Sequence, residues 1–418
     1  MLVHKNYDCT NYDSDKCPKG THIVRNLREN DDANFMLVGC WGVYCKNGLT
    51  DLKHYIPQKE KKTKRKEISE QKVENPEKQY ISTMRFFRNS SQIFGQKSVA
   101  KGMENNSNKN TIEALFLAGD NVYPDNIVRE ELIKMVNEQN YPSESECRQN
   151  NKISSQNIEK QLEEGFLKCF SNIAVKDFFI AIGNHDIENC HNLNYQLNYN
   201  QDLYKLPGLY YNVEYNLKDY DINFLIIDTN MFSKDYKTCN PDIEYSLNDY
   251  KIQKKWIINC LKKVNAKWNV IIGHVPYKAN GHSKKTPNEF NQHLDSIFID
   301  LNNLANKGEI PRVQIYFCAD EHNQQFLYDE PKKLSLVVAG SGGAILDTNI
   351  QTDGKYSKIT KFLSVNFGFV NFNFTENNVK IIYYKSGVGI IDKKDELLFL
   401  ANVDADGKLL YDVEKLAD

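Results

Sequence analysis

Five short motifs place polar side chains directly after apolar runs of the sequence. They are Gly39-Cys40-Trp41-Gly42, Gly119-Asp120-Asn121-Val122-Tyr123, Gly183-Asn184-His185-Asp186, Gly273-His274-Val275-Pro276-Tyr277 and Ala319-Asp320-Glu321-His322-Asn323. Each offers a carboxylate, amide, imidazole, phenol or thiol that can bind a metal ion. Donors that converge in this way suit two ions bridged by a carboxylate, which can clamp a phosphate and lower the pKa of a bound water. One such motif alone is more simply a turn with a capping side chain, but five together indicate a dinuclear centre.

The apolar runs that precede the motifs predict buried strands. They are residues 35–38, 114–118, 178–182, 268–272 and 313–317, with further strands expected at 209–217, 223–227 and 334–339 and an antiparallel hairpin over 368–383. Helical spacing occurs at 91–104, 126–138, 159–174, 249–264 and 290–306. Strands that alternate with helices indicate an α/β fold with a mixed sheet, in which sites gather at the carboxyl ends of the strands.

Composition excludes several classes of protein. The chain has 418 residues, 40% of them hydrophobic, which argues against global disorder and against a small disulfide scaffold. Its 53 basic and 55 acidic residues nearly balance, so no nucleic-acid partner is expected. The ten cysteines form no CxxC pair, which excludes a zinc ribbon. Because no signal-peptide core or membrane-span run is found, we expect an intracellular protein, cytoplasmic or packaged in a virion, with mostly free thiols.

The motifs resemble those of the calcineurin-like metallophosphoesterases, and specifically of the purple acid phosphatase branch. That family reads GDxG, GDxxY, GNH(D/E), GH and GHxH in this order, and Asp120 and Tyr123 have the spacing of the branch. The segment Gly340-Ser341-Gly342-Gly343 also fits. The resemblance covers roughly residues 34–388. It implies a four-layer sandwich of two mixed β-sheets flanked by helices.

The resemblance also divides the chain. Residues 1–33 would be a polar lead-in, 34–388 the phosphoesterase domain, and 389–418 a C-terminal extension. A charged insertion at about 51–85 interrupts the domain, and its basic cluster 61–66 is interpreted as a solvated loop or, alternatively, as a nuclear-localisation or anion-binding patch.

The family pattern implies a ligand for each metal position. Asp120 would bridge both ions, Tyr123 and His322 would bind the first, and Asn184 and His274 would bind the second. A tyrosine phenolate favours ferric iron, so the implied cofactors are two ions, iron paired with zinc, manganese or iron.

The resemblance also implies roles for three residues that would not bind metal. His185 would contact the phosphate or the leaving group. His282, which lies in a polar loop where the family often has a histidine, would serve as general acid. Asp186 would orient His185 or cap the following turn.

Two positions depart from the family pattern. Cys40 stands where the first motif has a metal-binding aspartate, and Asp320 stands where the last motif has a histidine. Both residue types still bind metal, but a thiolate is softer than a carboxylate. We therefore expect an altered metal preference.

Three functions remain open on this pattern. The first is a hydrolase resembling the acid phosphatases, in which a metal-bound hydroxide attacks phosphomonoesters. The second is a catalytically impaired pseudophosphatase that binds a protein partner as a scaffold. The third is a nucleotide or phosphodiester hydrolase on the same fold. Five of the seven ligand positions keep the expected residue type, which favours the enzyme.

Overall fold

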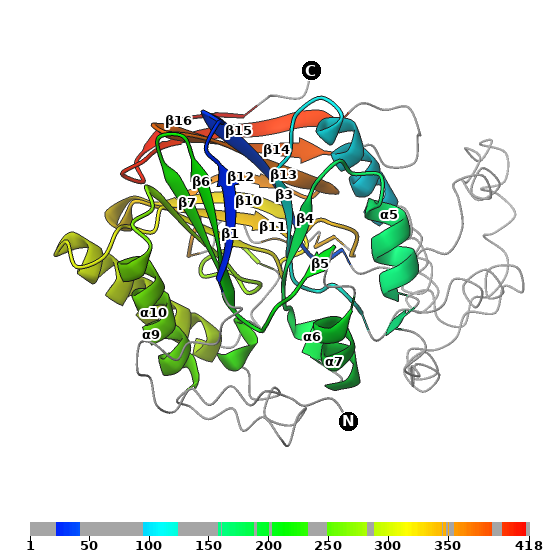
Figure 1. Cartoon of the computed structure of the whole chain (residues 1–418), viewed down its shortest axis with the longest axis horizontal. Coiled ribbons are helices and arrows are strands. Elements are labelled where there is room, and N and C mark those ends of the chain that lie inside the picture. The colour runs from blue at the N-terminus through cyan, green and yellow to red at the C-terminus, as the bar shows by residue number, and fades with distance from the viewer. Residues whose placement is uncertain are drawn as a thin grey trace, which may run out of the picture.

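The computed structural model describes residues 22–41, 95–123, 158–159, 161–187, 190–199, 203–232, 249–281, 288–344, 346–347, 350, 355–386 and 395–414. Within them, two eight-stranded mixed sheets pack face to face (Figure 1). This arrangement, with helices on the outer faces, confirms the predicted fold class. The insertion at about 51–85 and the expected helix at 126–138 lie outside the described residues.

The first sheet has its strands in the order β1-β6-β7-β8-β9-β11-β10-β12. Their bounds, in this order, are His22–Leu27, Tyr211–Leu217, Asp221–Ile226, Trp268–Ile272, Ile315–Cys318, Leu334–Ala339, Gln324–Asp329 and Thr360–Ser364. Strands β7, β8, β9 and β11 pair in parallel. Their carboxyl ends therefore lie at one end of this sheet.

The second sheet has its strands in the order β16-β15-β14-β13-β2-β3-β4-β5. Their bounds, in this order, are Leu409–Glu414, Glu396–Asp404, Asn378–Lys385, Gly368–Thr375, Asp32–Val38, Ala114–Ala118, Asp177–Ala181 and Tyr204–Lys205. Strands β2 to β5 are parallel, whereas β13 and β14 form the predicted antiparallel hairpin.

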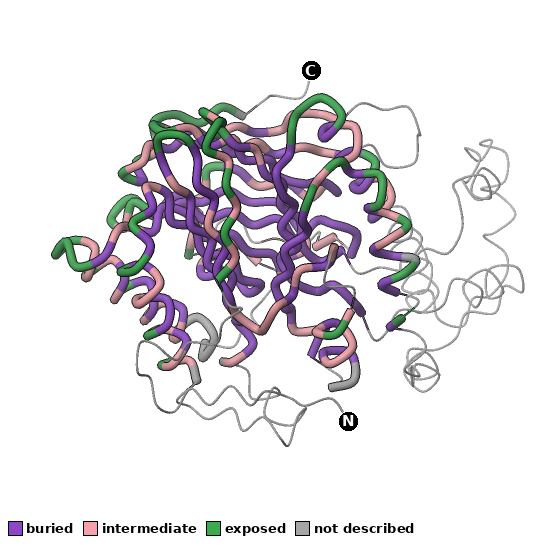
Figure 2. The backbone as a smooth tube through the Cα atoms, in the orientation of Figure 1, coloured by how far each residue is buried: buried purple, intermediate pink, exposed green. Residues whose placement is uncertain are grey.

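Aromatic side chains fill the space between the sheets. Phe116 of β3 lies with its ring centroid 4.5 Å from that of Phe224 of β7, and Phe35 of β2 lies 4.9 Å from the same ring. Strands β3 and β8 are buried along their whole length because both faces are covered, as is typical of parallel sheets. Figure 2 shows this buried interior, which holds the strand ends in fixed positions.

Helices cover the outer faces of both sheets. α9 (Asp249–Lys263) and α10 (Asn288–Asn306) place Trp256, Ile257 and Leu294 in the core cluster that includes Ile271 of β8. A helix over 95–107, a π-helical segment η2 (Gln161–Leu167) and α5 (Lys168–Phe170) contribute to the core cluster of the second sheet. Two short helices, α6 (Asn184–Ile187) and α7 (Cys190–Asn198), follow β4, and 3₁₀ turns span Asn230–Phe232 and Glu330–Lys332.

Both predicted flanking segments contribute strands. Within the predicted polar lead-in, residues 22–27 form β1, an edge strand of the first sheet. Exposed and half-buried positions alternate along β1, but apolar and polar residues do not, because Val24 lies on the exposed face and Arg25 on the inner face. The sequence pattern therefore does not indicate a strand here. The C-terminal segment supplies β15 and β16 to the second sheet.

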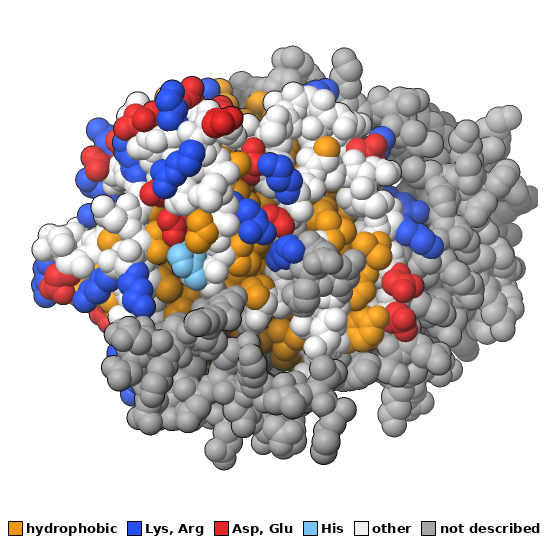
Figure 3. Space-filling model, in the orientation of Figure 1, with side chains coloured by type: hydrophobic (Ala, Val, Ile, Leu, Met, Phe, Trp, Pro, Cys, Tyr) orange, Lys and Arg blue, Asp and Glu red, His pale blue; other side chains and the backbone are white. Residues whose placement is uncertain are grey.

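The described surface shows charges of both signs. Figure 3 shows lysine and arginine side chains interspersed with aspartate and glutamate on the visible face. One pair joins the two sheets, because Arg25 of β1 donates to both carboxylate oxygens of Asp177 of β4, at 2.7 and 3.1 Å. Among the described helices, none has the length and apolarity that a membrane crossing requires.

Candidate metal centre

The five motifs converge because each follows a strand whose carboxyl end faces the same side of the sandwich. Cys40, Asp120 and Asp320 follow β2, β3 and β9 and have φ angles of 53°, 54° and 60°. Left-handed backbone at a residue with a side chain is uncommon, and it costs about 1–3 kcal/mol at each position. Such strain persists where surrounding contacts fix the conformation, and it clusters at functional sites.

Glycines allow the loops to approach closely. Gly119 has φ of +87°, and a Cβ atom there would lie 2.5 Å from His274 Nδ1. A Cβ atom on Gly183 would lie 2.2 Å from the backbone nitrogen of Asp120. These glycines bring the second, third and fourth motifs into contact.

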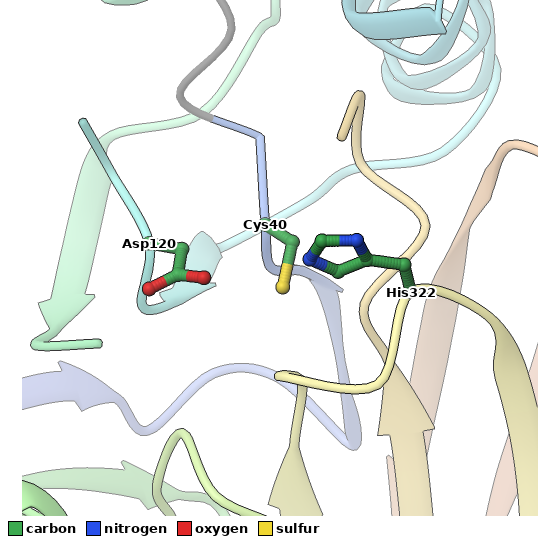
Figure 4. A group of neighbouring side chains, drawn as sticks. All are labelled: Cys40, Asp120 and His322. Atoms are coloured by element: carbon green, nitrogen blue, oxygen red, sulfur yellow. The ribbon is translucent and has the colours of Figure 1, made fainter. Parts of the chain in front are cut away.

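One half of the site gathers Cys40, Asp120, Tyr123 and His322, and we call it the first half. Ligand atoms of Cys40, Asp120 and His322 all lie within 4.8 Å of one another. Figure 4 shows the Cys40 thiol between the Asp120 carboxylate and the His322 ring. The Tyr123 hydroxyl donates to Asp120 Oδ2 at 3.1 Å and lies 3.4 Å from His322 Nε2. This half offers one sulfur, one nitrogen and two oxygen ligands.

The second half surrounds the His274 ring. Its Nε2 atom lies 3.0 Å from Asn184 Oδ1, 3.2 Å from Asp120 Oδ1 and 3.5 Å from Asp320 Oδ1. Its Nδ1 atom lies 2.7 Å from the carbonyl oxygen of Ala118. Because a carbonyl oxygen only accepts, Nδ1 carries a hydrogen, and Nε2 is directed at the three oxygens.

These spacings fit a pair of metal ions. Atoms that bind one ion tetrahedrally at ~2.0–2.1 Å are about 3.3 Å apart, and the distances around His274 Nε2 bracket that value. The Asp120 carboxylate directs Oδ2 to the first half and Oδ1 to the second, which is the arrangement of a bridging ligand. The residues present therefore fit a two-ion group.

Burial and mutual charge shift the pKa values of these ligands in the metal-free protein. Burial raises the pKa of the Cys40 thiol and of the Tyr123 phenol, and the charge of Asp120 adds to both effects. Burial would lower the pKa of His274, but Asp120 and Asp320 raise it well above its ordinary value. Burial would raise the pKa of Asp120, but His274 and His185 hold it far below its usual range. Burial and the charge of Asp120 thus favour the protonated thiol and phenol, and the two carboxylates favour the cationic imidazole.

Asp186 supports the second and third motifs from behind. Its carboxylate accepts from the backbone nitrogens of Asn121, Val122 and Gly183 and from the side chains of Asn121 and Gln196. Burial, followed by the charge of Asp120, raises its pKa to about 7 against the opposing effect of these donors. Asp186 therefore acts through the loops that carry the ligands.

Asn121 joins the first three motifs. Its Oδ1 atom accepts from Trp41 Nε1 at 2.9 Å, and its Nδ2 atom donates to Ala181 O at 2.8 Å and to Asp186 Oδ2 at 3.0 Å. All three bonds are buried. The sequence contained this residue inside a motif but did not indicate its connecting position.

Residues 340–344, 346 and 347, which we call the strap, fix the two ends of the first half. Gly342 and Ala344 donate to the carbonyl oxygens of Gly39 and Cys40, at 3.0 and 2.9 Å. Asp347 Oδ2 accepts from the backbone nitrogen of His322 at 2.8 Å. Sequence reasoning missed Asp347. Its only signal was the glycine cluster upstream, which is typical of a close backbone approach.

The two histidines predicted to contact substrate have different outcomes. His185 lies beside the centre, because its ring centroid is 4.6 Å from that of Tyr123 and its backbone nitrogen donates to Asp120 Oδ1 at 3.1 Å. His282 lies outside the described residues, and its role stays a prediction. The structure brings together all seven predicted metal ligands.

Comparison with known proteins identifies the family. The family model of calcineurin-like phosphoesterases matches residues 33–324. Purple acid phosphatase 17 of Arabidopsis thaliana is 24% identical over 235 residues, which are 53% of this chain and 65% of that protein. The chain thus spans slightly less than two thirds of this relative.

Two solved structures share the fold. GAP50, the anchor in the inner membrane complex of Plasmodium, has a TM-score of 0.50 at 14% identity and covers 88% of this chain and 89% of its own. PhoD has a TM-score of 0.53 at 12% identity and covers 93% and 72%. Identities this low support the fold alone. The match of the family model over residues 33–324 establishes that the chain belongs to the calcineurin-like phosphoesterase family, and the Arabidopsis relative shows sequence similarity to its purple acid phosphatase branch.

Proposed function

We propose that this protein is a metal-dependent hydrolase of phosphomonoesters that works at a dinuclear centre. The observation that carries the proposal is the Asp120 carboxylate, whose two oxygens face two separate sets of ligands. Cys40, Tyr123 and His322 complete the first set, and Asn184, His274 and Asp320 complete the second. Two bound ions would polarise the phosphate and lower the pKa of a water to about 7.

The chain's own residues would position the substrate and manage protons. The Nδ1–H of His274, held by Ala118 O, keeps Nε2 directed at the centre throughout. His185 is half-buried beside Tyr123, and its ring would donate a hydrogen bond to a phosphate oxygen or to the leaving oxygen. His282 would protonate the leaving group.

The scaffold alternative is less favoured by the same geometry. Both replaced positions keep a donor directed into the centre, since Cys40 lies with Asp120 and His322 and Asp320 lies 3.5 Å from His274. Asn121, Asp186 and the strap also hold the loops that carry these donors through hydrogen bonds that are buried or partly buried. A site freed from metal binding would not need these strained, tightly connected loops.

Elemental analysis and an aryl phosphate assay test the proposal. Purified protein should bind two ions per chain and turn over an aryl monophosphate with at least one of Mn, Fe, Zn and Mg. Asp120→Ala should lower turnover by ~100-fold or more, as expected when a group that binds the transition state is lost. A matched control is Asp219→Ala, because this exposed carboxylate lies in the turn after β6, away from the strand ends that form the centre.

Two results would contradict the proposal. The first is a folded chain that holds fewer than one ion and shows no turnover, which would favour the scaffold. The second is turnover of a bis-aryl phosphate well above that of the monophosphate, which would favour the phosphodiester alternative.

A further inference from the structure

The two halves of the centre differ in the softness of their ligands. Cys40 brings a sulfur atom to the first half, and its side chain is fully buried beside Asp120 and His322. Another buried cysteine, Cys318, is the last residue of β9 in the first sheet and belongs to the core beneath α9 and α10, where it donates to Val337 O. Among the cysteines that the structure describes, Cys40 is therefore the one that the fold directs to the metal centre.

The second half is harder than the family pattern would make it. Asp320 replaces an imidazole with a carboxylate, so His274 Nε2 faces three oxygens, one each from Asn184, Asp120 and Asp320. Hard oxygen ligands suit Mn²⁺ and Mg²⁺, whereas thiolates select softer ions such as Zn²⁺. The two departures from the family pattern thus shift the two halves in opposite directions.

We propose that the two halves select different ions: a thiophilic ion, Zn²⁺, in the first half and an oxygen-preferring ion, Mn²⁺ or Mg²⁺, in the second. The inference rests on the proposed function, because it assumes the two-ion centre. Zn²⁺ would occupy the first half in place of the ferric iron that Tyr123 alone would favour. Cys40 sets this choice through its sulfur, and Asp320 sets it through its charge.

The test must separate the halves, because Zn²⁺ binds most nitrogen and oxygen sites more tightly than Mn²⁺ does. Cd²⁺ serves as the thiophilic probe and Mn²⁺ as the hard probe. Metal-free full-length protein is titrated with Cd²⁺ while the thiolate-to-metal charge-transfer absorbance in the ultraviolet is followed. Mn²⁺ is then added, and its binding is followed by electron paramagnetic resonance and elemental analysis.

The expected result is one Cd²⁺ and one Mn²⁺ per chain, with the charge-transfer band complete after the first equivalent of Cd²⁺. Cys40→Ser should lose this band and weaken Cd²⁺ binding at least ~10–100-fold, the effect that even an outer partner of a metal ligand has. Cys318→Ser, the matched control, should keep both. Asp320→Asn should weaken Mn²⁺ binding and leave the Cd²⁺ band unchanged.

The wild-type protein alone can overturn the inference if Cys40→Ser fails to fold. A first equivalent of Cd²⁺ that gives no charge-transfer band, or Mn²⁺ that displaces this Cd²⁺, would refute the selection. A band that persists in a folded Cys40→Ser variant would also refute it. None of these measurements uses turnover. An active enzyme without metal selection would overturn this inference and leave the proposed function intact.

Discussion

Loading the centre with two metal ions should release three protons per chain from protein side chains, one each from Cys40, Tyr123 and His274, apart from the proton of a bound water whose pKa falls to about 7. Each of these groups holds its proton in the metal-free protein, because burial raises the pKa values of the thiol and the phenol and the neighbouring carboxylates raise that of the imidazole. Metal ligands bind deprotonated, so each proton must leave. Of the three protons, two leave from the first half and one leaves from the second.

The division sets the pH dependence of each half. His274 keeps its Nδ1–H on Ala118 O, so the proton that a metal ion displaces is the one on Nε2. Each displaced proton makes the apparent affinity fall tenfold when the pH falls by one unit, as long as the pH stays below the pKa of the group. Lowering the pH by one unit should therefore weaken binding ~100-fold in the first half and ~10-fold in the second. Acidification should therefore weaken binding in the first half more steeply than in the second.

Calorimetric titration in buffers of different ionisation enthalpy measures the number of released protons directly. Tyr123→Phe and Cys40→Ser should each lower the count by one, and neither should change the proton released by the second half. A wild-type count of one or fewer would refute the protonation states inferred here. The same holds if Tyr123→Phe releases as many protons as the wild type.

Four further outcomes follow from the supports of the centre. Asp347→Ala should weaken Cd²⁺ binding in the first half ~10–100-fold in the titration, because it removes the side-chain acceptor of the His322 backbone nitrogen, and should leave Mn²⁺ binding unchanged. Asn121→Ala removes three buried hydrogen bonds and should lower the free energy of unfolding by about 3 kcal/mol in urea. Arg25→Ala should lower the free energy of unfolding by about 2 kcal/mol without changing metal binding, because it leaves the buried Asp177 carboxylate without its cation. The effect stays modest because the Arg25 side chain is one-third exposed. Chelation of the ions should lower the unfolding free energy by about 2.7 kcal/mol for each site that was held at 100 times its Kd, and re-addition of metal should restore it.

The sequence predicted the strands that carry the site because these strands are buried on both faces. The bounds of β8 and β11 agree with the expected 268–272 and 334–339. Continuous apolar runs that end at glycine are a clear signal, and the polar residues that follow them must lie at the carboxyl edge. The assembly of the seven ligands was therefore predictable from order and spacing.

Edge strands and long-range supports were not predictable in the same way. β1 has no fully buried position, and its sequence His-Ile-Val-Arg-Asn-Leu lacks the strict alternation of polar and apolar residues that marks a half-buried strand. Asp347 contacts His322 across 25 residues of sequence, and Asn121 accepts from Trp41 across 80. Such contacts depend on the register and packing of whole strands, which local propensity does not encode.

The backbone at Cys40 and Asp320 bears on what the two replacements mean. Both residues have left-handed φ angles, as does Asp120, which keeps the family's residue type. A side chain makes this conformation unfavourable, and glycine would relieve it at either position. The fold nevertheless holds Cys40 there through hydrogen bonds from its own backbone to Gly119 and from Ala344 of the strap. Both replaced positions thus combine a donor of changed chemical type with a strained backbone that directs it into the centre. The proposed selection of a different pair of metal ions would need this combination, whereas a site that no longer binds metal would have no use for it.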